Sequence, residues 1–423
     1  MKILYISQYF PPEMGAPAAR VSELSRHWVR AGHEVTVLTG FPNHPDGIIR
    51  REYRPRFWRG VFRERVDGIN VVRTWLLPLP NRKPYERMLN YSSFCISAAL
   101  TGTFLERPDV VIATSPQLLV GLSGWWVGKI KRVPLVLEIR DLWPESLVAV
   151  GAGDPGSLLH RVLGRIAGFL YRRATQIVVV TPAFREHLER AWQVSREKIA
   201  VVQNGVETAL FHPQRNSEVR TALRAEGKFL VSYIGTLGAA HGLETLISAA
   251  ECLQRLAPEV LFLLIGEGAE RARVLAAIES RRLSNIRFVP QQPRERIPAY
   301  ICASDACLVL LKKSAVFETV IPTKMLEFMS CARPVILGVN GEARQLLDQA
   351  RAGIYVEPEN PAALSDAIRR LQQNPGVGQA MGRNGRDYVV QNLSRQRTAR
   401  DYLDLLLALA AMPARSQNAT AAA

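Results

Sequence analysis

Short apolar runs alternate along the chain with longer stretches whose apolar residues recur every three or four positions. Runs of this length between amphipathic stretches are typical of a parallel β-sheet that is buried on both faces. Between residues 17 and 31, Val21, Leu24, Trp28 and Ala31 fall on one face of a helix. The runs before residue 203 predict strands at Ile3–Ile6, Val35–Leu38, Ile69–Arg73, Val110–Ala113, Leu135–Glu138, Ile177–Val180 and Ile199–Val202.

The same alternation starts again after Asn204-Gly205. Residues 203–216 contain Asn-Gly and His-Pro and suit a linker. The second set predicts strands at Leu230–Ile234, Val260–Ile265, Ile286–Val289, Ala306–Leu311, Pro334–Leu337 and Ile354–Val356. We therefore predict an α/β protein with two doubly wound, Rossmann-like domains at 1–205 and 206–385. A last helix is expected at 386–411, followed by a disordered tail at 412–423.

Composition agrees with an ordinary folded chain of two domains. The sequence has 423 residues, of which 48% are hydrophobic and 22% charged. The formal charge is +16, and most of the excess lies in residues 1–205. This sign favours an anionic partner, which leaves nucleic acid, anionic lipid and phosphorylated substrates open.

The compartment and membrane signals point to the cytoplasm. The five cysteines form no CxxC pair, so we expect reduced thiols. The N-terminal apolar run is short and predicts a strand rather than a signal peptide. Residues 89–105 and 110–127 are lightly charged but are interrupted by polar residues, so a spanning helix is the less favoured interpretation.

Ligands of open α/β sheets bind beyond the carboxyl ends of the strands, so candidate residues are sought there. After the first strand, Glu13, Gly15 and Arg20 lie around the start of a helix, where glycine permits close approach and arginine adds a cation. The alternative is an ordinary strand-to-helix turn. No GxGxxG motif occurs here, which argues against a dinucleotide enzyme.

The strand at 135–138 ends in a dense group of ionisable residues. Glu138, Arg140 and Asp141 precede Trp143-Pro144-Glu145. Charges at the end of a buried strand are costly unless they are paired or used. An internal ion pair of Arg140 with Asp141 or Glu138 is the structural alternative to a functional site.

Two further places suit an anion. Gly235, Gly238 and Gly242 lie between a strand and a helix, where exposed backbone N–H groups can hold a phosphate, although a structural loop remains open. In the segment at 317–329, Pro322 and Thr323 start a helix, and Lys324 strengthens its attraction for an anion. Glu327 could accept hydrogen bonds from a ribose diol, whereas a Lys/Glu surface pair is the alternative.

These places, in this order, resemble the family 4 retaining glycosyltransferases of the GT-B fold, over essentially the whole chain. The motifs that carry the resemblance are Pro11-Pro12-Glu13 with Gly15, Gly32–Thr39, Asp109–Val111 before Thr114-Ser115-Pro116, Asn204-Gly205-Val206 and Pro322–Met329. The run Glu138–Ser146 resembles the WbuB-type subgroup, which is similar to L-fucosamine transferases of surface-polysaccharide assembly.

The resemblance implies that the two domains face a cleft, with the nucleotide-sugar on the C-terminal domain and the acceptor on the N-terminal domain. It also implies that the last helix crosses back to the first domain. Asp141, Lys324 and Glu327 would be catalytic. Acceptor-binding residues would be Glu13, Gly15, Arg20 and Arg140. Donor-binding residues would be Gly235, Thr236, Gly238, His241, Gly266, Gly268, Val289, Glu318, Thr319, Val320, Ile321, Pro322, Thr323 and Met325.

The sequence departs from the family pattern in the phosphate-binding loop. Thr236 and His241 stand where the family commonly has Arg and Lys, so Lys324, Lys312 or Lys313 would have to compensate. Thr319 stands where the first glutamate of the paired motif is expected, and Glu318 lies one position away. Many members also have His where Arg140 stands.

The activity that the resemblance implies is transfer of a sugar, such as N-acetyl-L-fucosamine or another N-acetylated hexose, from a UDP-linked donor. The transfer would retain anomeric configuration and need no metal or other cofactor, since no DxD pair occurs at a strand end. The acceptor would be a polyprenyl-diphosphate-linked saccharide in O-antigen, capsule or exopolysaccharide assembly.

A membrane surface is the expected partner of the basic segment at 50–65, in which arginines alternate with Phe57, Trp58 and Phe62. Residues 82–105 could add an apolar contact, so we expect a peripheral protein on the cytoplasmic face of the membrane. A solvated basic loop is the alternative. Three other functions stay open: a GT-B nucleotide-sugar epimerase, a non-catalytic nucleotide-sugar-binding subunit, and a nucleic-acid protein, for which no binding motif is found.

Overall fold

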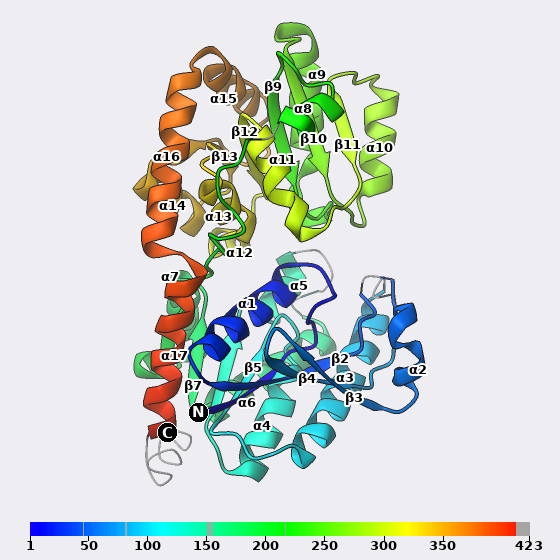
Figure 1. Cartoon of the computed structure of the whole chain (residues 1–423), viewed down its shortest axis with the longest axis vertical. Coiled ribbons are helices and arrows are strands. Elements are labelled where there is room, and N and C mark those ends of the chain that lie inside the picture. Colours follow the sequence, from blue (N-terminus) through cyan, green and yellow to red (C-terminus); the bar gives the residue numbers. More distant parts are fainter. Residues whose placement is uncertain (45, 81–82, 150–153, 155, 216, 412–423) are drawn as a thin grey trace. The chain divides into compact units, whose positions relative to one another are not determined.

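The computed structural model describes residues 1–44, 46–80, 83–149, 154, 156–215 and 217–411. The chain divides into two compact units (Figure 1). The N-terminal unit comprises Met1–Gln203 and Gln396–Ala423, and the C-terminal unit comprises Asn204–Arg395. The disorder predicted for residues 412–423 lies outside the described residues.

The sheet of the N-terminal unit has the order β3-β4-β2-β1-β5-β6-β7-β8. Its neighbours are parallel except for β3, which pairs antiparallel with β4. The strand β3 was not expected from the sequence. The strands are β1 (Lys2–Ile6), β2 (Glu34–Gly40), β3 (Val61–Val66), β4 (Ile69–Thr74), β5 (Val110–Thr114), β6 (Leu135–Ile139), β7 (Gln176–Val179) and β8 (Ile199–Val201).

Helices cover both faces of this sheet (Figure 1). The glycines of α4 allow the helix to approach the sheet, because an added Cβ on Gly124 would overlap Ala113 of β5. The helices are α1 (Ala16–Arg30), α2 (Arg54–Phe57), α3 (Pro84–Phe104), α4 (Val120–Lys131), α5 (Glu145–Ala149), α6 (Leu158–Arg173), α7 (Pro182–Trp192) and α17 (Arg395–Ala411).

The helix α17 packs against α1 on one face of the sheet. The Trp28 and Tyr402 rings meet edge to face with centroids 5.4 Å apart, and Trp28 Nε1 donates to the Ala399 carbonyl at 2.9 Å. Leu406 is fully buried in the same cluster as Ile3 and Val37. The final helix therefore completes the core of the N-terminal unit.

The C-terminal unit has a parallel sheet of order β11-β10-β9-β12-β13-β14. Its strands are β9 (Phe229–Ile234), β10 (Val260–Ile265), β11 (Ile286–Val289), β12 (Ala306–Leu310), β13 (Val335–Gly338) and β14 (Gly353–Tyr355). Its helices are α8 (Ser217–Ala222), α9 (Leu243–Leu256), α10 (Arg271–Ser280), α11 (Ile297–Ala303), α12 (Ala315–Glu318), α13 (Thr323–Ser330), α14 (Glu342–Ala350), α15 (Pro361–Gln373) and α16 (Pro375–Asn392).

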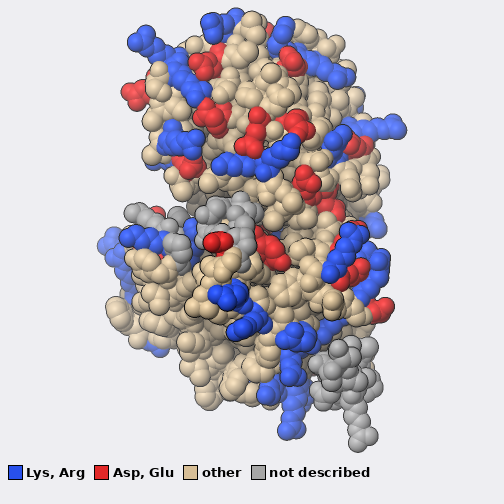
Figure 2. Space-filling model, turned by 180° about the vertical axis from the view of Figure 1, so that it is seen from behind, with Lys and Arg blue, Asp and Glu red and all other residues tan. Residues whose placement is uncertain are grey.

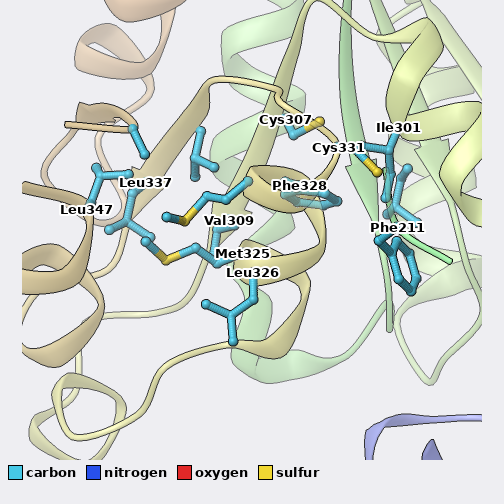
Figure 3. Packing of buried hydrophobic residues seen from close by; sticks show 14 of the residues in the cluster. Phe211, Ile301, Cys307, Val309, Met325, Leu326, Phe328, Cys331, Leu337 and Leu347 are labelled. Atoms are coloured by element: carbon cyan, nitrogen blue, oxygen red, sulfur yellow. The ribbon is translucent and has the colours of Figure 1, made fainter. Parts of the chain in front are cut away.

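The helix α13 is held in place by a dense apolar core. Figure 3 shows Met325, Leu326 and Phe328 of this helix among the surrounding strands and helices. Met325 and Phe328 are fully buried. Cys302, Cys307 and Cys331 lie in the same core, and each of the five cysteines is a thiol. The apolar side of α13 packs into this core, and the polar residues of the helix lie on the opposite side.

The prediction of one helix over 386–411 is wrong. The helix α16 ends at Asn392 and α17 begins at Arg395. Between these two helices the backbone forms hydrogen bonds that are not helical. Val206 N donates to the Leu393 carbonyl at 2.9 Å, and Arg395 N donates to the Val206 carbonyl at 2.7 Å. These bonds pull residues 393–395 out of helical register, so residues 386–392 belong to the C-terminal unit.

Among the described residues, none forms a helix with the length and apolar character that crossing a bilayer requires.

Candidate active site

The strand order changes direction at one place in each sheet. In the C-terminal unit β9 lies between β10 and β12, and in the N-terminal unit β1 lies between β2 and β5. The loops that follow such strands diverge to opposite faces and leave a crevice in which ligands of doubly wound sheets bind. Gly235 follows β9 and Lys312 follows β12, whereas Glu13 follows β1 and Ser115 follows β5.

Lys324 is a buried cation without a partner. No hydrogen-bond partner for Nζ exists among the described residues, and the ammonium lies 4.0 Å from the centroid of the Tyr233 ring. Burial lowers the pKa of Lys324 to about 7, and the charge of Glu327 opposes this shift. An anion placed here would supply the missing hydrogen-bond acceptor and favour the charged form.

The loop after β9 lies directly over this ammonium. An added Cβ on Gly235 would come 3.3 Å from Lys324 Nζ, and the backbone at Gly235 has a φ of 146°. The first N–H groups of α13, which carries Lys324, have no partners within the helix. A cation, a helix N-terminus and an open glycine loop therefore converge, as expected for a site that binds a diphosphate.

His241 adds a neutral side chain to this loop. Burial and the neighbouring Lys324 charge lower the pKa of His241 to about 3. Its ring lies 6.1 Å from that of Tyr233, and its Nδ1 atom has no partner within the described chain. The residue can form a hydrogen bond with a ligand but adds no positive charge. It therefore does not replace the charge of the Lys that the family commonly has at this position.

Two further glycines are required by close backbone approach. An added Cβ on Gly266 would overlap the Gly235 carbonyl oxygen, and one on Gly268 would overlap that of Leu237. Gly235 N donates to the Ile265 carbonyl, and Leu237 N donates to the Glu267 carbonyl. The loops after β9 and β10 are thus locked together. Val289, at the end of β11, joins them because Gly266 N donates to its carbonyl.

Glu327 lies one turn beyond Lys324 and is held by an arginine that the sequence did not indicate. Arg294 Nη1 donates to Glu327 Oε1 at 2.9 Å. The Arg294 guanidinium also stacks on Phe211 at 5.0 Å from the ring centroid. The only sequence signal was a basic residue shortly after a strand, and a separation of 33 positions gave no sign of the pairing.

The remaining predicted donor residues differ in their surroundings. Glu318 ends α12, and residues 319–322 lead into α13, which begins at Thr323. Glu318 lies against Gly341, where an added Cβ would overlap the Glu318 carbonyl. Thr236, Gly238, Thr319, Val320, Pro322 and Thr323 are at least partly exposed.

Two of the predicted donor residues turn their side chains into the core. Met325 is fully buried and Ile321 is 7% exposed, both within the apolar cluster around α13. Any donor contact at these two positions would therefore come from the backbone, and their assignment as donor-binding residues stays a prediction. Of the two other lysines considered, Lys313 is paired with Glu357 at 2.9 Å, whereas Lys312 is exposed beside the glycine loop.

In the N-terminal unit, Glu13 is a buried carboxyl with one oxygen engaged. Oε1 accepts hydrogen bonds from the backbone N–H groups of Asn43 and His44, both at 3.0 Å. Oε2 is buried and has no partner among the described residues. Burial raises the pKa of Glu13 to about 7. Gly15, just beyond it, has a φ of 129° and precedes α1.

Arg140 and Asp141 follow β6 and are anchored by Ser115. Ser115 Oγ accepts from the backbone N–H groups of Arg140 at 2.6 Å and Asp141 at 3.3 Å. The Nε and Nη1 atoms of Arg140 are buried and unpartnered within the described residues. Burial raises the pKa of Asp141 to about 6, while the Arg140 charge acts to lower it.

Two tyrosines connect these groups, and sequence reasoning missed both. Tyr9 and Tyr91 share a side-chain hydrogen bond, Tyr9 lies near the Glu13 charge, and Tyr91 lies near the Asp141 charge. Burial raises the pKa of both phenols, so both are neutral donors at neutral pH. Both tyrosines therefore lie near two of the residues that the sequence predicted for this site, Glu13 and Asp141.

Arg20 does not belong to an exposed binding surface, which corrects its prediction as an acceptor-binding residue. Its guanidinium is 1% exposed and donates to Glu138 Oε1 at 2.8 and 2.9 Å. It also donates to the Val202 and Gln203 carbonyls, while Tyr5 donates to Glu138 Oε2. The expected internal ion pair exists, but Arg20 rather than Arg140 forms it.

The basic segment at 50–65 is folded rather than a loop. It contains α2 and β3, and Tyr53 and Phe57 are buried against Phe41. Trp58 is 84% exposed, and Arg54, Arg56 and Arg59 are exposed around it. The segment is therefore structured rather than a loop, and it presents cations beside an exposed tryptophan; the solvated and the membrane-bound interpretations of these side chains both stay predictions.

Known protein families match both parts of the chain. The family described as Glycosyl transferase 4-like domain matches residues 15–205. The family described as Glycosyl transferases group 1 matches residues 214–388. The two matches together cover the N-terminal sheet from β2 to β8 and the whole C-terminal sheet.

Individual proteins match over nearly the full length. The putative colanic acid biosynthesis glycosyl transferase WcaI of Escherichia coli is 26% identical over 420 residues, which are 96% of this chain and 99% of WcaI. The structure of sucrose-phosphate synthase from Thermosynechococcus elongatus superposes with a TM-score of 0.76 at 22% identity, covering 96% of this chain and 98% of that one. HepE from Anabaena, solved in complex with UDP-glucose, superposes with a TM-score of 0.73 at 17% identity, covering 96% and 100%.

These matches agree with the two Rossmann-like sheets, the glycine loops and the polar groups that follow the strands. The likeness to the WbuB-type subgroup is not confirmed and stays a prediction. The chain belongs to the family 4 glycosyltransferases of the GT-B fold.

Proposed function

We propose that this glycosyltransferase moves an N-acetylated hexose from a UDP-linked donor to a polyprenyl-diphosphate-linked saccharide during surface-polysaccharide assembly. The C-terminal unit binds the donor, and the N-terminal unit binds the acceptor at the membrane surface. The name of WcaI supports the polysaccharide role, and the UDP-glucose complex of HepE supports the nucleotide. The proposed transfer retains configuration and needs no metal.

The observation that carries this proposal is the unpartnered Lys324 ammonium beneath the Gly235 loop. When the bond to a nucleoside diphosphate breaks, negative charge accumulates on the leaving diphosphate. A preorganised ammonium and the N-terminus of α13 stabilise that charge. Glu327 holds the ribose hydroxyls and fixes the diphosphate relative to Lys324.

The acceptor side supplies hydrogen-bonding groups rather than a strong base. In the proposed front-face reaction, the acceptor oxygen bonds to the anomeric carbon on the face that the leaving phosphate oxygen departs from. That phosphate oxygen takes the acceptor's proton. Glu13 Oε2 and the Arg140 guanidinium are the unpartnered groups that orient the acceptor, and Asp141 adds a carboxyl with a raised pKa.

The decisive experiment combines nucleotide binding with product analysis. UDP, GDP and ADP are titrated into the purified protein, with and without EDTA, and the melting temperature is recorded, since a ligand of the native state raises it. We expect a shift with UDP that EDTA does not remove. UDP-sugars are then incubated with polyprenyl-diphosphate saccharides, and the new glycosidic bond is identified by mass spectrometry and NMR.

Each outcome has a defined meaning. An axial product from an axial donor supports retention, and an inverted product overturns it. Activity that EDTA abolishes and Mg²⁺ restores overturns metal independence. Consumption of the donor without an acceptor indicates an epimerase, and binding without turnover over all tested acceptors indicates a non-catalytic subunit.

A further inference from the structure

The helix α3 exposes a row of large apolar side chains along an arc of its surface. Tyr85, Leu89, Ile96, Leu100 and Phe104 are between 50% and 84% exposed. At 100° per residue they fall within about 100° of arc, and they extend over about 28 Å of helix. Soluble proteins rarely expose apolar patches of this extent unless something else covers them.

Three hydroxyl groups of the same helix bond to the segment that precedes it instead. Ser93 Oγ accepts from Leu77 N at 2.8 Å, and Thr101 Oγ1 lies 2.8 Å from Thr74 Oγ1. Ser97 Oγ donates to the Trp75 carbonyl. The hydroxyls are thus used internally while the aliphatic residues point outward. The fold does not use the exposed side chains in its own core, so they are available to a partner.

The apolar arc continues onto neighbouring elements. On α4, Trp126 and Ile130 are 42% and 43% exposed, and Trp126 Nε1 donates to Thr103 Oγ1 at the end of α3. At the other side, Trp75 stacks with Phe57, which contacts the exposed Trp58. We call the exposed apolar residues of α3 together with Trp126 and Ile130 the α3–α4 surface.

Cations border this surface, and the nearest acidic groups are already engaged. Lys83, Arg107, Lys129 and Arg132 are exposed at its ends. Glu86 accepts from the Lys83 backbone N–H, and Glu106 pairs with Lys2. Figure 2 shows, over the N-terminal unit, a wide area without charged side chains that is bounded by Lys and Arg.

We infer that the α3–α4 surface docks on an anionic lipid bilayer, with α3 lying in the plane of the interface. Aliphatic side chains enter the acyl region, tryptophan and tyrosine lie at the headgroup level, and the bordering lysines and arginines contact lipid phosphates. Charge complementarity selects this occupant over a second copy of the chain, which would bring the same cations together. The main membrane contact is therefore α3 with α4, and the segment at 50–65 is accessory.

The inference rests on the proposed lipid-linked acceptor for its role, but it is tested without donor or acceptor. The purified protein is sedimented with vesicles of phosphatidylcholine alone or with 30% phosphatidylglycerol. We expect binding to the anionic vesicles. The variant L89S/I96S/L100S should bind at least about tenfold more weakly, because three aliphatic side chains no longer enter the bilayer. In K129Q/R132Q the preference for phosphatidylglycerol should shrink while binding through apolar contacts persists.

The control variant is L256S, which removes an equally exposed leucine from α9 of the C-terminal unit. It should bind vesicles like the unsubstituted protein.

The melting-temperature shift with UDP in every variant verifies the fold. If L89S/I96S/L100S keeps that shift and full vesicle binding, the inference is overturned. If its vesicle binding is unchanged but a dimer becomes a monomer, a second copy covers the surface. Absence of a melting-temperature shift with UDP in the unsubstituted protein would contradict the proposed function but not the inference about the α3–α4 surface.

Discussion

Arg294 donates from Nη1 to Glu327 Oε1 at 2.9 Å, so the carboxylate proposed to hold the ribose is oriented by a guanidinium from another loop. Arg294 lies in a short 3₁₀ helix after β11, and Glu327 lies on α13. Stacking on Phe211 limits the freedom of the guanidinium. The pair links the loop after β11 to the helix that carries Lys324.

The first prediction concerns this pair. In R294Q, Glu327 loses its charged donor, and UDP affinity should fall about tenfold, as expected when a half-buried charged hydrogen bond is lost. The preference for UDP over 2′-deoxy-UDP should also shrink, because a mobile carboxylate no longer selects the hydroxyl. Calorimetric titration measures both. R296Q changes an exposed arginine of the same short helix and should bind UDP normally. If R294Q keeps the preference while E327Q loses it, Arg294 does not position Glu327.

The second prediction concerns the contact between the two glycine loops. In G266A the new Cβ overlaps the Gly235 carbonyl, and the φ of 153° is strained for alanine, so unfolding should require about 1–3 kcal/mol less. The displaced Gly235 loop should also weaken UDP binding. Urea unfolding and UDP titration measure these effects. In G376A the Cβ enters open space on α16, so stability should stay equal or rise slightly. Normal stability and UDP affinity in G266A would contradict the close approach.

The third prediction concerns the buried ion pair of the N-terminal unit. R20M leaves the Glu138 carboxylate buried without its counter-ion and should reduce the free energy of unfolding by about 3–5 kcal/mol. Adding E138Q removes the uncompensated charge and should restore part of the loss. Urea unfolding followed by tryptophan fluorescence reports on this unit, since all seven tryptophans of the chain lie before residue 203. A loss below about 1 kcal/mol in R20M would show that the pair does not hold the unit together.

Most strands could be predicted from sequence because each is a short run that is buried on both faces. The strand β3 was missed because it lacks this feature. It is an edge strand, and Arg63, Glu64 and Arg65 interrupt its apolar pattern. The break at residues 393–395 was missed because it depends on backbone bonds to Val206, nearly 190 positions earlier. Local patterns identify elements, whereas such pairings are set by the tertiary fold.

The same limit applies to the candidate site. Lys324 and the glycine loops were found because a helix start after proline and a glycine-rich turn are local signals. Arg294, Tyr9 and Tyr91 were missed because their roles arise from partners on other elements. Arg20 was assigned to a ligand because its partner Glu138 lies 118 positions away. A charge seen in sequence does not show whether the fold has already paired it.

The fourth prediction concerns the pH dependence of nucleotide binding. In the free protein, burial lowers the pKa of Lys324 to about 7, and a bound diphosphate must raise it because the anion favours the ammonium. Above pH 7 binding therefore requires uptake of a proton, so UDP affinity should fall with a slope that approaches tenfold per pH unit. The diphosphate is already almost fully ionised in this range, so its own titration adds little.

Calorimetric titration between pH 7 and 9 measures the slope. K324A should bind weakly with a flat profile, while K312A, which removes an exposed lysine beside the same loop, should keep the slope. A flat profile in the unsubstituted protein would show that the Lys324 ammonium is not the group that meets the diphosphate.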